Sequence, residues 1–327
     1  MDNFVSIIVP TKKINDLIIK DLLPALQKQT FKKFELIIIA DKYIEKSTFP
    51  DFIKIIILNK NTGPANKRDL GVKKAKGNII AFIDADAYPD KNWLKNALKY
   101  FKSAKNAAVC GPGITPPKNN IKQKVSGWVW QSTLGAGGAG TYRNQLEKKR
   151  FVDDYPSFNL IVRKKDFATI SGFDSHYWPG EDTKLCHDLV YKLGRKIVYD
   201  PEVIVYHHRR SIFTPHLTQI ARFGLHRGYF VKILPKTSKK IGYFIPLIFL
   251  IFLLTTPMLF LIFPFLIPIY QLLIFVYLIL LIITAVNIYF KEKNILISLL
   301  IIPAIISTHI IYGLMFAKGL IARQLKQ

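Results

Sequence analysis

A pair of carboxylates stands directly after a short apolar run. Asp84 and Asp86, one residue apart, follow Ile79–Ile83. Two carboxylates on a turn that leaves a buried strand can face one cleft, where they could hold Mg2+ or Mn2+ together with phosphate oxygens. Asp-x-Asp pairs are also common in ordinary turns, so the spacing alone does not decide between a metal site and a plain turn.

Repeated strand and helix patterns place these carboxylates. Buried strands are predicted at 4–10, ended by Pro10, and at 34–40, 53–58 and 78–83; helices are predicted at 17–29, kinked at Pro24, and at 66–75. Such alternation predicts an α/β fold with a mostly parallel, Rossmann-like sheet covered on both faces. Ligands of these sheets bind beyond the carboxyl ends of the strands. Asp41 and Asp84 both stand at such ends.

Charge and hydropathy separate along the chain. The 327 residues carry a net charge of +25, yet their mean hydropathy is positive, at +0.19. Residues 1–240 hold 42 basic and 21 acidic side chains, whereas residues 241–327 hold five basic and one acidic. This distribution excludes a disordered chain, a small disulfide scaffold and a simple soluble enzyme. The two cysteines, Cys110 and Cys186, fit a reducing compartment and suggest neither a disulfide nor a zinc site.

The apolar tail predicts membrane-spanning helices. The segment from Tyr243 to Phe290 runs for 48 residues without a charge. As one helix it would measure about 72 Å, against a hydrocarbon core of roughly 30 Å, so it must turn. Pro264 and Pro268 mark the expected turn. We therefore predict about three spans, at 243–264, 269–290 and 295–317.

Basic residues suggest how the chain is oriented. Eight of them precede the first span: Arg209, Arg210, Arg222, Arg227, Lys232, Lys236, Lys239 and Lys240. The positive-inside rule then predicts a multi-pass protein of the cell membrane, with a domain at 1–208 on the cytoplasmic side. An interfacial segment at 209–240 would rest on anionic lipid, at about 1 kcal/mol per charge. Three spans would place Lys318, Arg323 and Lys326 outside, against the rule, so a re-entrant or interfacial segment stays open.

Several motifs occur in an order that resembles one enzyme family. They are Val5–Thr11, Asn61–Gly71, Ala75–Gly77, Asp84–Asp86, Pro89, Trp93–Leu94, Gly172–Asp174, Gly180–Leu185 and Pro201–His207. Together they resemble the family 2 glycosyltransferases, which are inverting enzymes of the GT-A fold. The resemblance covers roughly residues 4 to 230. It implies an α/β catalytic domain that binds a nucleotide-diphosphate sugar and a divalent cation.

The resemblance implies a nucleotide site. Pro10, Thr11, Asp41 and Arg68 would lie around the base and adjoining groups, and Asp84 would reach the ribose or the metal shell. Many members carry two successive aspartates after the second strand, but here Asp41 is followed by Lys42. This departure leaves the identity of the nucleotide open.

A metal site is also implied. Asp86 would be the direct ligand of Mg2+ or Mn2+, with His207 as a further ligand and His208 as its alternative. The metal would neutralise charge on the leaving diphosphate. Because Arg209 and Arg210 follow, the two histidines could instead form a basic contact to phosphate or lipid headgroups.

Inversion requires a general base opposite the leaving group. Asp182 resembles that base, with Glu181 orienting it or the acceptor. Carboxylates after Gly180 also suit capping of a helix N-terminus, and both roles are compatible. Trp178 would stack on a sugar or pack in the core.

The expected acceptor follows from the architecture. Gln219 to Phe223 resembles the Gln-x-x-Arg-Trp motif of processive polysaccharide synthases, with Phe in place of Trp, and Arg222 would contact substrate diphosphate or anionic lipid. Three spans are few for a polymer channel. We therefore expect transfer of a hexose to a membrane-bound, lipid-linked sugar in polysaccharide or glycan assembly. The alternatives are a polyprenyl-phosphate sugar synthase and an inactive membrane adaptor. Nucleic acid is not an expected partner, because no compact basic motif carries interleaved aromatics.

Overall fold

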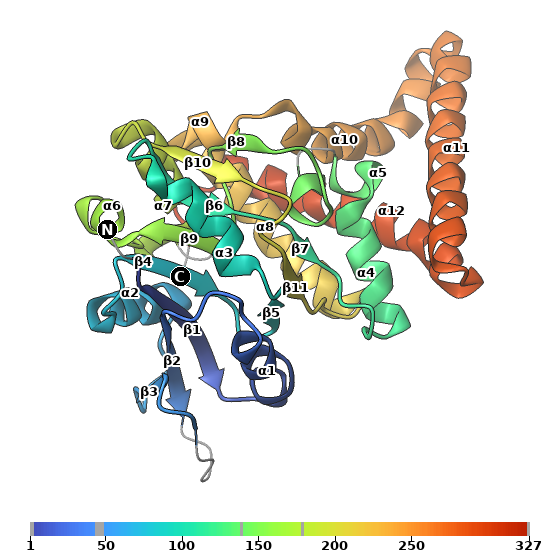
Figure 1. Ribbon diagram of the computed structural model, residues 1–327. Coiled ribbons are helices and arrows are strands. Elements are labelled where there is room, and N and C mark those ends of the chain that lie inside the picture. Colours follow the sequence, from blue (N-terminus) through green and yellow to red (C-terminus); the bar gives the residue numbers. More distant parts are fainter. Residues whose placement is uncertain (1–2, 43–48, 138–139, 178–179, 326–327) are drawn as a thin grey trace. The chain divides into compact units, whose positions relative to one another are not determined.

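The computed structural model describes residues 3–42, 49–137, 140–177 and 180–325. They form two compact units (Figure 1). The sheet unit comprises residues 1–116 and 145–208, and the helical unit comprises residues 117–144 and 209–326. The segment 117–144 therefore belongs with the C-terminal helices, although it lies within the predicted domain 1–208.

An eight-stranded sheet forms the centre of the sheet unit. In spatial order its strands are β3 (Ile53–Ile57), β2 (Phe34–Lys42), β1 (Val5–Lys13), β4 (Ile79–Ile83), β9 (Asn159–Arg163), β6 (Asn106–Cys110), β10 (Lys196–Tyr199) and β8 (Arg150–Val152). The pairs β3–β2, β2–β1, β1–β4 and β6–β10 are parallel, whereas β9 is antiparallel to both of its neighbours and β8 is antiparallel to β10. The predicted mostly parallel α/β sheet is confirmed.

The first strand continues past its proline, so the predicted end at Pro10 is wrong. β1 runs to Lys13, and Pro10 pairs with Ile39 of β2. On the other side of β1, pairing with β4 stops at Ile8. Pro10 therefore sits where one side of the strand is already an edge, a position at which the missing N–H costs no ladder hydrogen bond.

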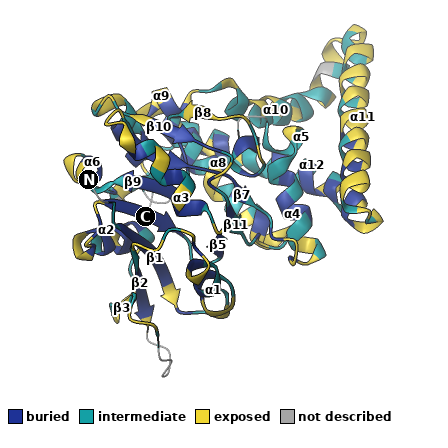
Figure 2. Cartoon of the chain, in the orientation of Figure 1, coloured by how far each residue is buried: buried dark blue, intermediate teal, exposed yellow. Residues whose placement is uncertain are grey.

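Helices of the sheet unit connect its strands. They are α1 (Leu23–Gln27), preceded by a wide turn at Ile18–Leu22, α2 (Pro64–Lys74), α3 (Trp93–Leu98), α6 (Lys164–Thr169) and α7 (Glu181–His187). Pro24 directly follows this wide turn within one continuous helical run over residues 16–27, and prolines and wide turns of this kind are where helices kink. Gly71 lets α2 approach β1, because a Cβ there would lie 2.6 Å from Cγ2 of Ile8. Figure 2 shows the buried strands beneath the more exposed helices.

A second, three-stranded sheet lies beside the carboxyl end of β4. It consists of β5 (Ala87–Pro89), β11 (Val205–His207) and β7 (Gly113–Ile114), with β11 in the middle. The β5–β11 pairing is antiparallel and aligns His207 with Ala87. This register brings His207 next to the acidic turn that follows β4.

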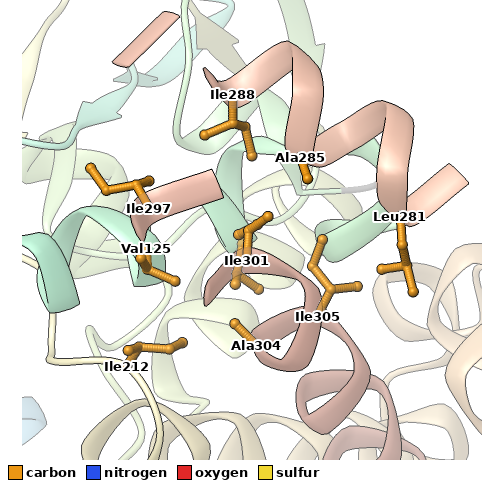
Figure 3. Packing of buried hydrophobic residues seen from close by; sticks show 10 residues of the cluster. Val125, Ile212, Leu281, Ala285, Ile288, Ile297, Ile301, Ala304 and Ile305 are labelled. Carbon is orange, nitrogen blue, oxygen red and sulfur yellow. The ribbon is translucent and has the colours of Figure 1, made fainter. Parts of the chain in front are cut away.

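The helical unit contains α4 (Ile121–Gln131), α5 (Thr133–Ala136), α8 (Thr214–Ile233), α9 (Pro235–Ser238), α10 (Ile241–Ile262), α11 (Ile267–Glu292) and α12 (Ile295–Ile321). The last three are long and apolar enough to cross a membrane. A core of branched aliphatic side chains joins α4 to α11 and α12, as Figure 3 shows for Val125, Ile288, Ile297 and Ile301.

Candidate active site

The acidic turn after β4, the N-terminal part of α7 and the end of β11 form one cluster of functional side chains within the sheet unit. Arg68 on α2 connects two of these elements. Its guanidinium donates to Oδ1 of Asp84 over 2.8 Å and to Oε1 of Glu181 over 3.1 Å. The Arg68 and Glu181 side chains are only 5% and 6% exposed, so this is a buried charge network.

The charge balance of this network depends on Arg68. Burial alone would lower the pKa of Arg68, but the neighbouring carboxylates of Asp84 and Glu181 raise it, so the guanidinium stays charged. The ring of Phe173 covers the guanidinium, with 5.5 Å between the Arg68 Cζ and the ring centroid. Arg68 therefore holds parts of the chain more than a hundred residues apart in a fixed geometry.

Three side chains at the acidic turn form a group that could hold a metal ion. Ligand atoms of Asp84, Asp86 and His207 all lie within 4.8 Å of one another. Nε2 of His207 is 3.2 Å from Oδ1 of Asp86, and the His207 ring stacks on Phe158 at a centroid distance of 4.7 Å. Two carboxylates and one imidazole form a donor set that suits Mn2+, and also Mg2+ when waters complete the shell. The residues present fit the cation that the sequence motifs imply.

The neighbouring histidine has a different partner. Nε2 of His208 lies 3.0 Å from Oδ2 of Asp21, and its ring lies beside Tyr88. Asp21 belongs to the turn that precedes α1. The geometry thus separates two adjacent histidines that the sequence left as alternatives, and it places His207 in the metal-binding group.

Asp182 is a carboxylate with a raised pKa. Burial raises the pKa of Asp182 to about 7, and the nearby charges of Glu181 and Asp154 add to this effect. Burial also raises the pKa of Glu181, against the opposing charge of Arg68. The backbone N–H of Thr183 donates to Oδ1 of Asp182 over 2.8 Å, which fixes the orientation of the carboxylate at the start of α7. A carboxylate with this pKa can accept a proton near neutral pH.

Asp41 is held by a lysine that sequence reasoning missed. Lys67 Nζ lies 2.7 Å from Oδ2 of Asp41 and donates to the Thr11 carbonyl over 2.6 Å. The backbone N–H of Thr62 donates to the other Asp41 oxygen over 3.1 Å. The Lys67 and Asp41 side chains are 3% and 7% exposed. The sequence offered one signal for this role: Lys67 lies in the helix that starts at Pro64, beside the carboxyl edge of the sheet.

Asp69 is a second residue that the sequence did not single out. Its Oδ1 accepts from the backbone N–H of Phe173 over 3.0 Å. Gly172 makes this turn at a φ of +74°, in the left-handed region that favours glycine. Burial raises the pKa of Asp69 to about 6. Asp69 thus anchors the turn that presents Phe173 to Arg68.

Two predicted site residues belong to the other unit, and a third is not among the described residues. Trp178 falls outside the described residues. Gln219 and Arg222 lie on α8 in the helical unit, and Arg222 is exposed. Pro10 and Thr11 lie near the end of β1, and Thr11 is joined to Asp41 through Lys67.

The fold and this site define a glycosyltransferase of the GT-A type. Over residues 6–169, half of the chain, the sequence matches the family model described as glycosyl transferase family 2. The chain belongs to that family. The predicted enzyme class is therefore confirmed.

Relatives with assigned activities are distant. A Methanococcus voltae protein, named dolichyl N-acetyl-alpha-D-glucosaminyl phosphate 3-beta-D-2,3-diacetamido-2,3-dideoxy-beta-D-glucuronosyltransferase, is 25% identical over 246 residues, which cover 70% of this chain and 74% of that protein. Glycosyltransferase AglE of Haloferax volcanii is 25% identical over 58% of this chain and 63% of its own length. Pre-mycofactocin glycosyltransferase of Mycobacterium tuberculosis is 24% identical over 53% of this chain, and the match spans only 36% of that protein.

A solved structure shares the fold. The mannosyltransferase PcManGT from Pyrobaculum calidifontis, in complex with GDP-Man and Mn2+, superposes with a TM-score of 0.52. The two chains are 17% identical, and the match covers 72% of this chain and 65% of the other. At this identity the likeness concerns the fold, and the predicted GT-A architecture is confirmed.

Proposed function

We propose that this glycosyltransferase moves a hexose from a nucleoside-diphosphate sugar to a lipid-linked sugar, with inversion at the anomeric carbon. The carrying observation is the Arg68 network, which joins the metal-binding turn at Asp84 to the Glu181–Asp182 pair. A donor diphosphate and an acceptor base must face each other across the reacting carbon, and Arg68 joins the carboxylates that are proposed for the two sides. The names of the Methanococcus protein and of a glucosyl-dolichyl phosphate glucuronosyltransferase from Haloferax volcanii support a lipid-linked sugar as the acceptor.

The proposed reaction assigns the proton to Asp182. The acceptor hydroxyl attacks the anomeric carbon from the face opposite the diphosphate and gives its proton to the Asp182 carboxylate. The bond from the anomeric carbon to the diphosphate oxygen breaks, and the nucleoside diphosphate leaves with the electron pair. Glu181, held by Arg68, positions the helix start that carries Asp182.

The donor diphosphate would lie at the acidic turn. A divalent cation held by Asp84, Asp86 and His207 would offset the negative charge of the diphosphate. Nucleotide contacts are proposed for Pro10, Thr11 and Asp41, which lie at the carboxyl edge of the sheet. In the helical unit, Gln219 and Arg222 are proposed to face the acceptor lipid or its phosphate.

The membrane assignment completes the proposal. Three apolar helices follow a catalytic part with a basic segment at 209–240. We propose that the catalytic part lies on the cytoplasmic side of the cell membrane, where the basic segment contacts anionic lipid.

The product of transfer tests this function. Membranes that contain the enzyme, incubated with a panel of labelled nucleotide sugars, are expected to form a labelled lipid whose new linkage resists mild acid. An acid-labile product made from polyprenyl phosphate alone would instead identify a polyprenyl-phosphate sugar synthase. Proton NMR of the product would contradict inversion if the donor and product share the same anomeric configuration.

The two adjacent histidines provide a matched test of the metal site. His207→Ala should weaken Mn2+ binding by at least about tenfold, because a ligand is lost. His208→Ala should leave Mn2+ affinity unchanged, since His208 pairs with Asp21. Titration calorimetry with Mn2+ on the purified protein measures both, independently of turnover. Equal losses in the two variants would contradict the assignment, as would transfer activity that survives thorough chelation.

A further inference from the structure

On the membrane assignment proposed above, on which this inference rests, the helices α4 and α8 lie on the same side of the bilayer as the catalytic part. Among the described residues, every helix that could span a membrane begins after residue 240. The chain leaves the sheet unit after residue 116, forms α4 and re-enters the sheet unit at residue 145 without such a helix. The same holds for α8, which precedes α10. We call the side on which residues 1–240 lie the transferase side.

The junction between α11 and α12 is fixed to α4. Glu292, at the end of α11, forms a 3.0 Å ion pair with Lys124 and accepts from the indole N–H of Trp128 over 3.0 Å. Lys291 Nζ lies 5.2 Å from the centroid of the Trp128 ring. Figure 3 shows Val125 of α4 next to Ile297 at the beginning of α12. α12 therefore begins on the transferase side.

The other end of α12 is fixed to α8. The Lys232 ammonium donates to the carbonyl of Ala322, directly after α12. In the first turn of α8, Nε2 of His216 lies 3.1 Å from the Thr308 hydroxyl. The offset between partners is nearly constant along the two helices, so α8 and α12 run parallel and end together. α12 therefore also ends on the transferase side.

Glycines hold this helix pair in close contact. A Cβ on Gly228 would lie 2.1 Å from the Phe316 carbonyl oxygen, and one on Gly319 would lie 2.1 Å from that of Leu225. Gly224 and Gly228 stand four residues apart, a spacing that lets helix backbones approach closely. The contact is continuous rather than a single crossing point, so this half of α12 lies at the same depth as α8.

The exposed sides of the two helices differ in chemistry. α8 exposes Thr218, Arg222 and Lys232 together with Phe223 and Ile233, whereas α12 exposes Leu296, Leu299 and Leu314, with Lys318 near its end. Charged residues such as these are costly within the hydrocarbon core and favourable at the headgroups. A helix pair that exposes both basic and large apolar side chains fits the interface between water and lipid.

We infer that α12 lies along the bilayer surface, so that only the hairpin of α10 and α11 enters the bilayer, beyond the contact of Tyr277 with His309, and the C-terminus returns to the transferase side. A crossing helix separates its ends by roughly 30 Å of hydrocarbon. Both ends of α12 instead contact elements that precede the first span. The arrangement also places Lys318 and Arg323 on the same side as the basic segment 209–240, which removes the conflict with the positive-inside rule.

Cysteine labelling of the full chain in native membranes tests this topology. Single cysteines at Lys236, Lys291, Gln324 and Phe265 would be probed with a membrane-impermeant maleimide in sealed vesicles of both orientations. Lys236, Lys291 and Gln324 should react from the transferase side, and Phe265, in the turn between α10 and α11 at the inserted end of the hairpin, should not react from that side. Both native cysteines are buried, so the unmodified chain gives the background.

Two outcomes would overturn the inference. Labelling of Gln324→Cys from the side opposite Lys236→Cys would show an odd number of crossings. Labelling of Phe265→Cys from the transferase side would show that the turn between α10 and α11 does not enter the bilayer.

A glycine pair tests the role of α8 in holding α12. Gly228→Ala should make the end of α12 near Gln324 more accessible to protease that is added on the transferase side of the vesicles. The added methyl group would push the two helices apart. Gly140→Ala is the matched control in the same unit, since nothing lies within 4 Å of its Cβ position. Equal protease sensitivity of both variants would contradict the helix pairing.

Discussion

Replacing Asp182 with asparagine is expected to lower kcat by roughly 10²- to 10⁴-fold, the usual contribution of a positioned general base. The amide keeps the shape of the side chain but cannot accept a proton from the acceptor hydroxyl. Nucleotide-sugar affinity should change little, because the nucleotide and metal groups lie on other elements. Single-turnover transfer and a separate nucleotide-binding titration measure the two effects.

The pH profile should carry the signature of the same carboxylate. Because burial raises the pKa of Asp182 to about 7, the base is protonated and inactive below that pH and ionised above it. The rate should therefore rise with pH and reach half of its maximum near pH 7, with about one tenth of the limiting rate one unit lower. The midpoint belongs to the coupled pair of Glu181 and Asp182 rather than to one group.

The control is a carboxylate outside the site. Asp16→Asn removes an exposed partner of Lys20 and should leave both rate and profile unchanged. Near-wild-type turnover in Asp182→Asn would show that Asp182 is not the general base. An unaltered ascending limb in that variant would assign the titration to another group.

The sequence predicted those site residues that stand directly at the end of a strand or at the start of a helix. Asp84, Asp86 and Glu181 stand beside recognisable strand and helix boundaries, and the structure brings Asp84 and Glu181 to Arg68 and Asp86 to His207. His207 could not be separated from His208, because the distinction depends on the β5–β11 register and on Asp21, far away in the sequence.

Other residues were missed because they act through tertiary contacts. Lys67 resembles any helical lysine until β1 and β2 bring the Thr11 carbonyl and Asp41 within reach. Asp69 likewise gains its role from the turn at Gly172. Local patterns cannot show such pairings, since the partners are separated by many residues.

The same distinction between local sequence pattern and tertiary contact applies to the fold. Hydrophobic periodicity predicted the parallel strands and the apolar helices, because both depend on local composition. The assignment of α4 to the helical unit depends instead on contacts such as Ser126 with His216, whose Oγ and Nδ1 atoms are 2.8 Å apart. The continuation of β1 through Pro10 depends on where its neighbour β4 stops pairing.

Arg68→Met should be the most destabilising single change in the site. It leaves Glu181 buried without its cation and also removes the partner of Asp84, and breaking a buried pair in this way costs about 3–5 kcal/mol. Without Arg68, the pKa of Glu181 should rise further, because burial already raises it and the opposing charge is gone. The melting temperature of the detergent-solubilised full chain is expected to fall accordingly.

A double-mutant cycle separates the charge network from general damage. Glu181→Gln removes the charge that Arg68→Met leaves unpaired, so the double variant should be more stable than the sum of the two single effects predicts. Arg163→Met is the matched control, because Arg163 donates to backbone carbonyls of Phe101, Ser103 and Asn106, and these partners in the described part of the chain include no carboxylate. Additive losses for Arg68→Met and Glu181→Gln would show that the two side chains are not coupled. They would also remove the physical link between the metal-binding turn and the base at Asp182, on which the proposed alignment of donor and acceptor rests.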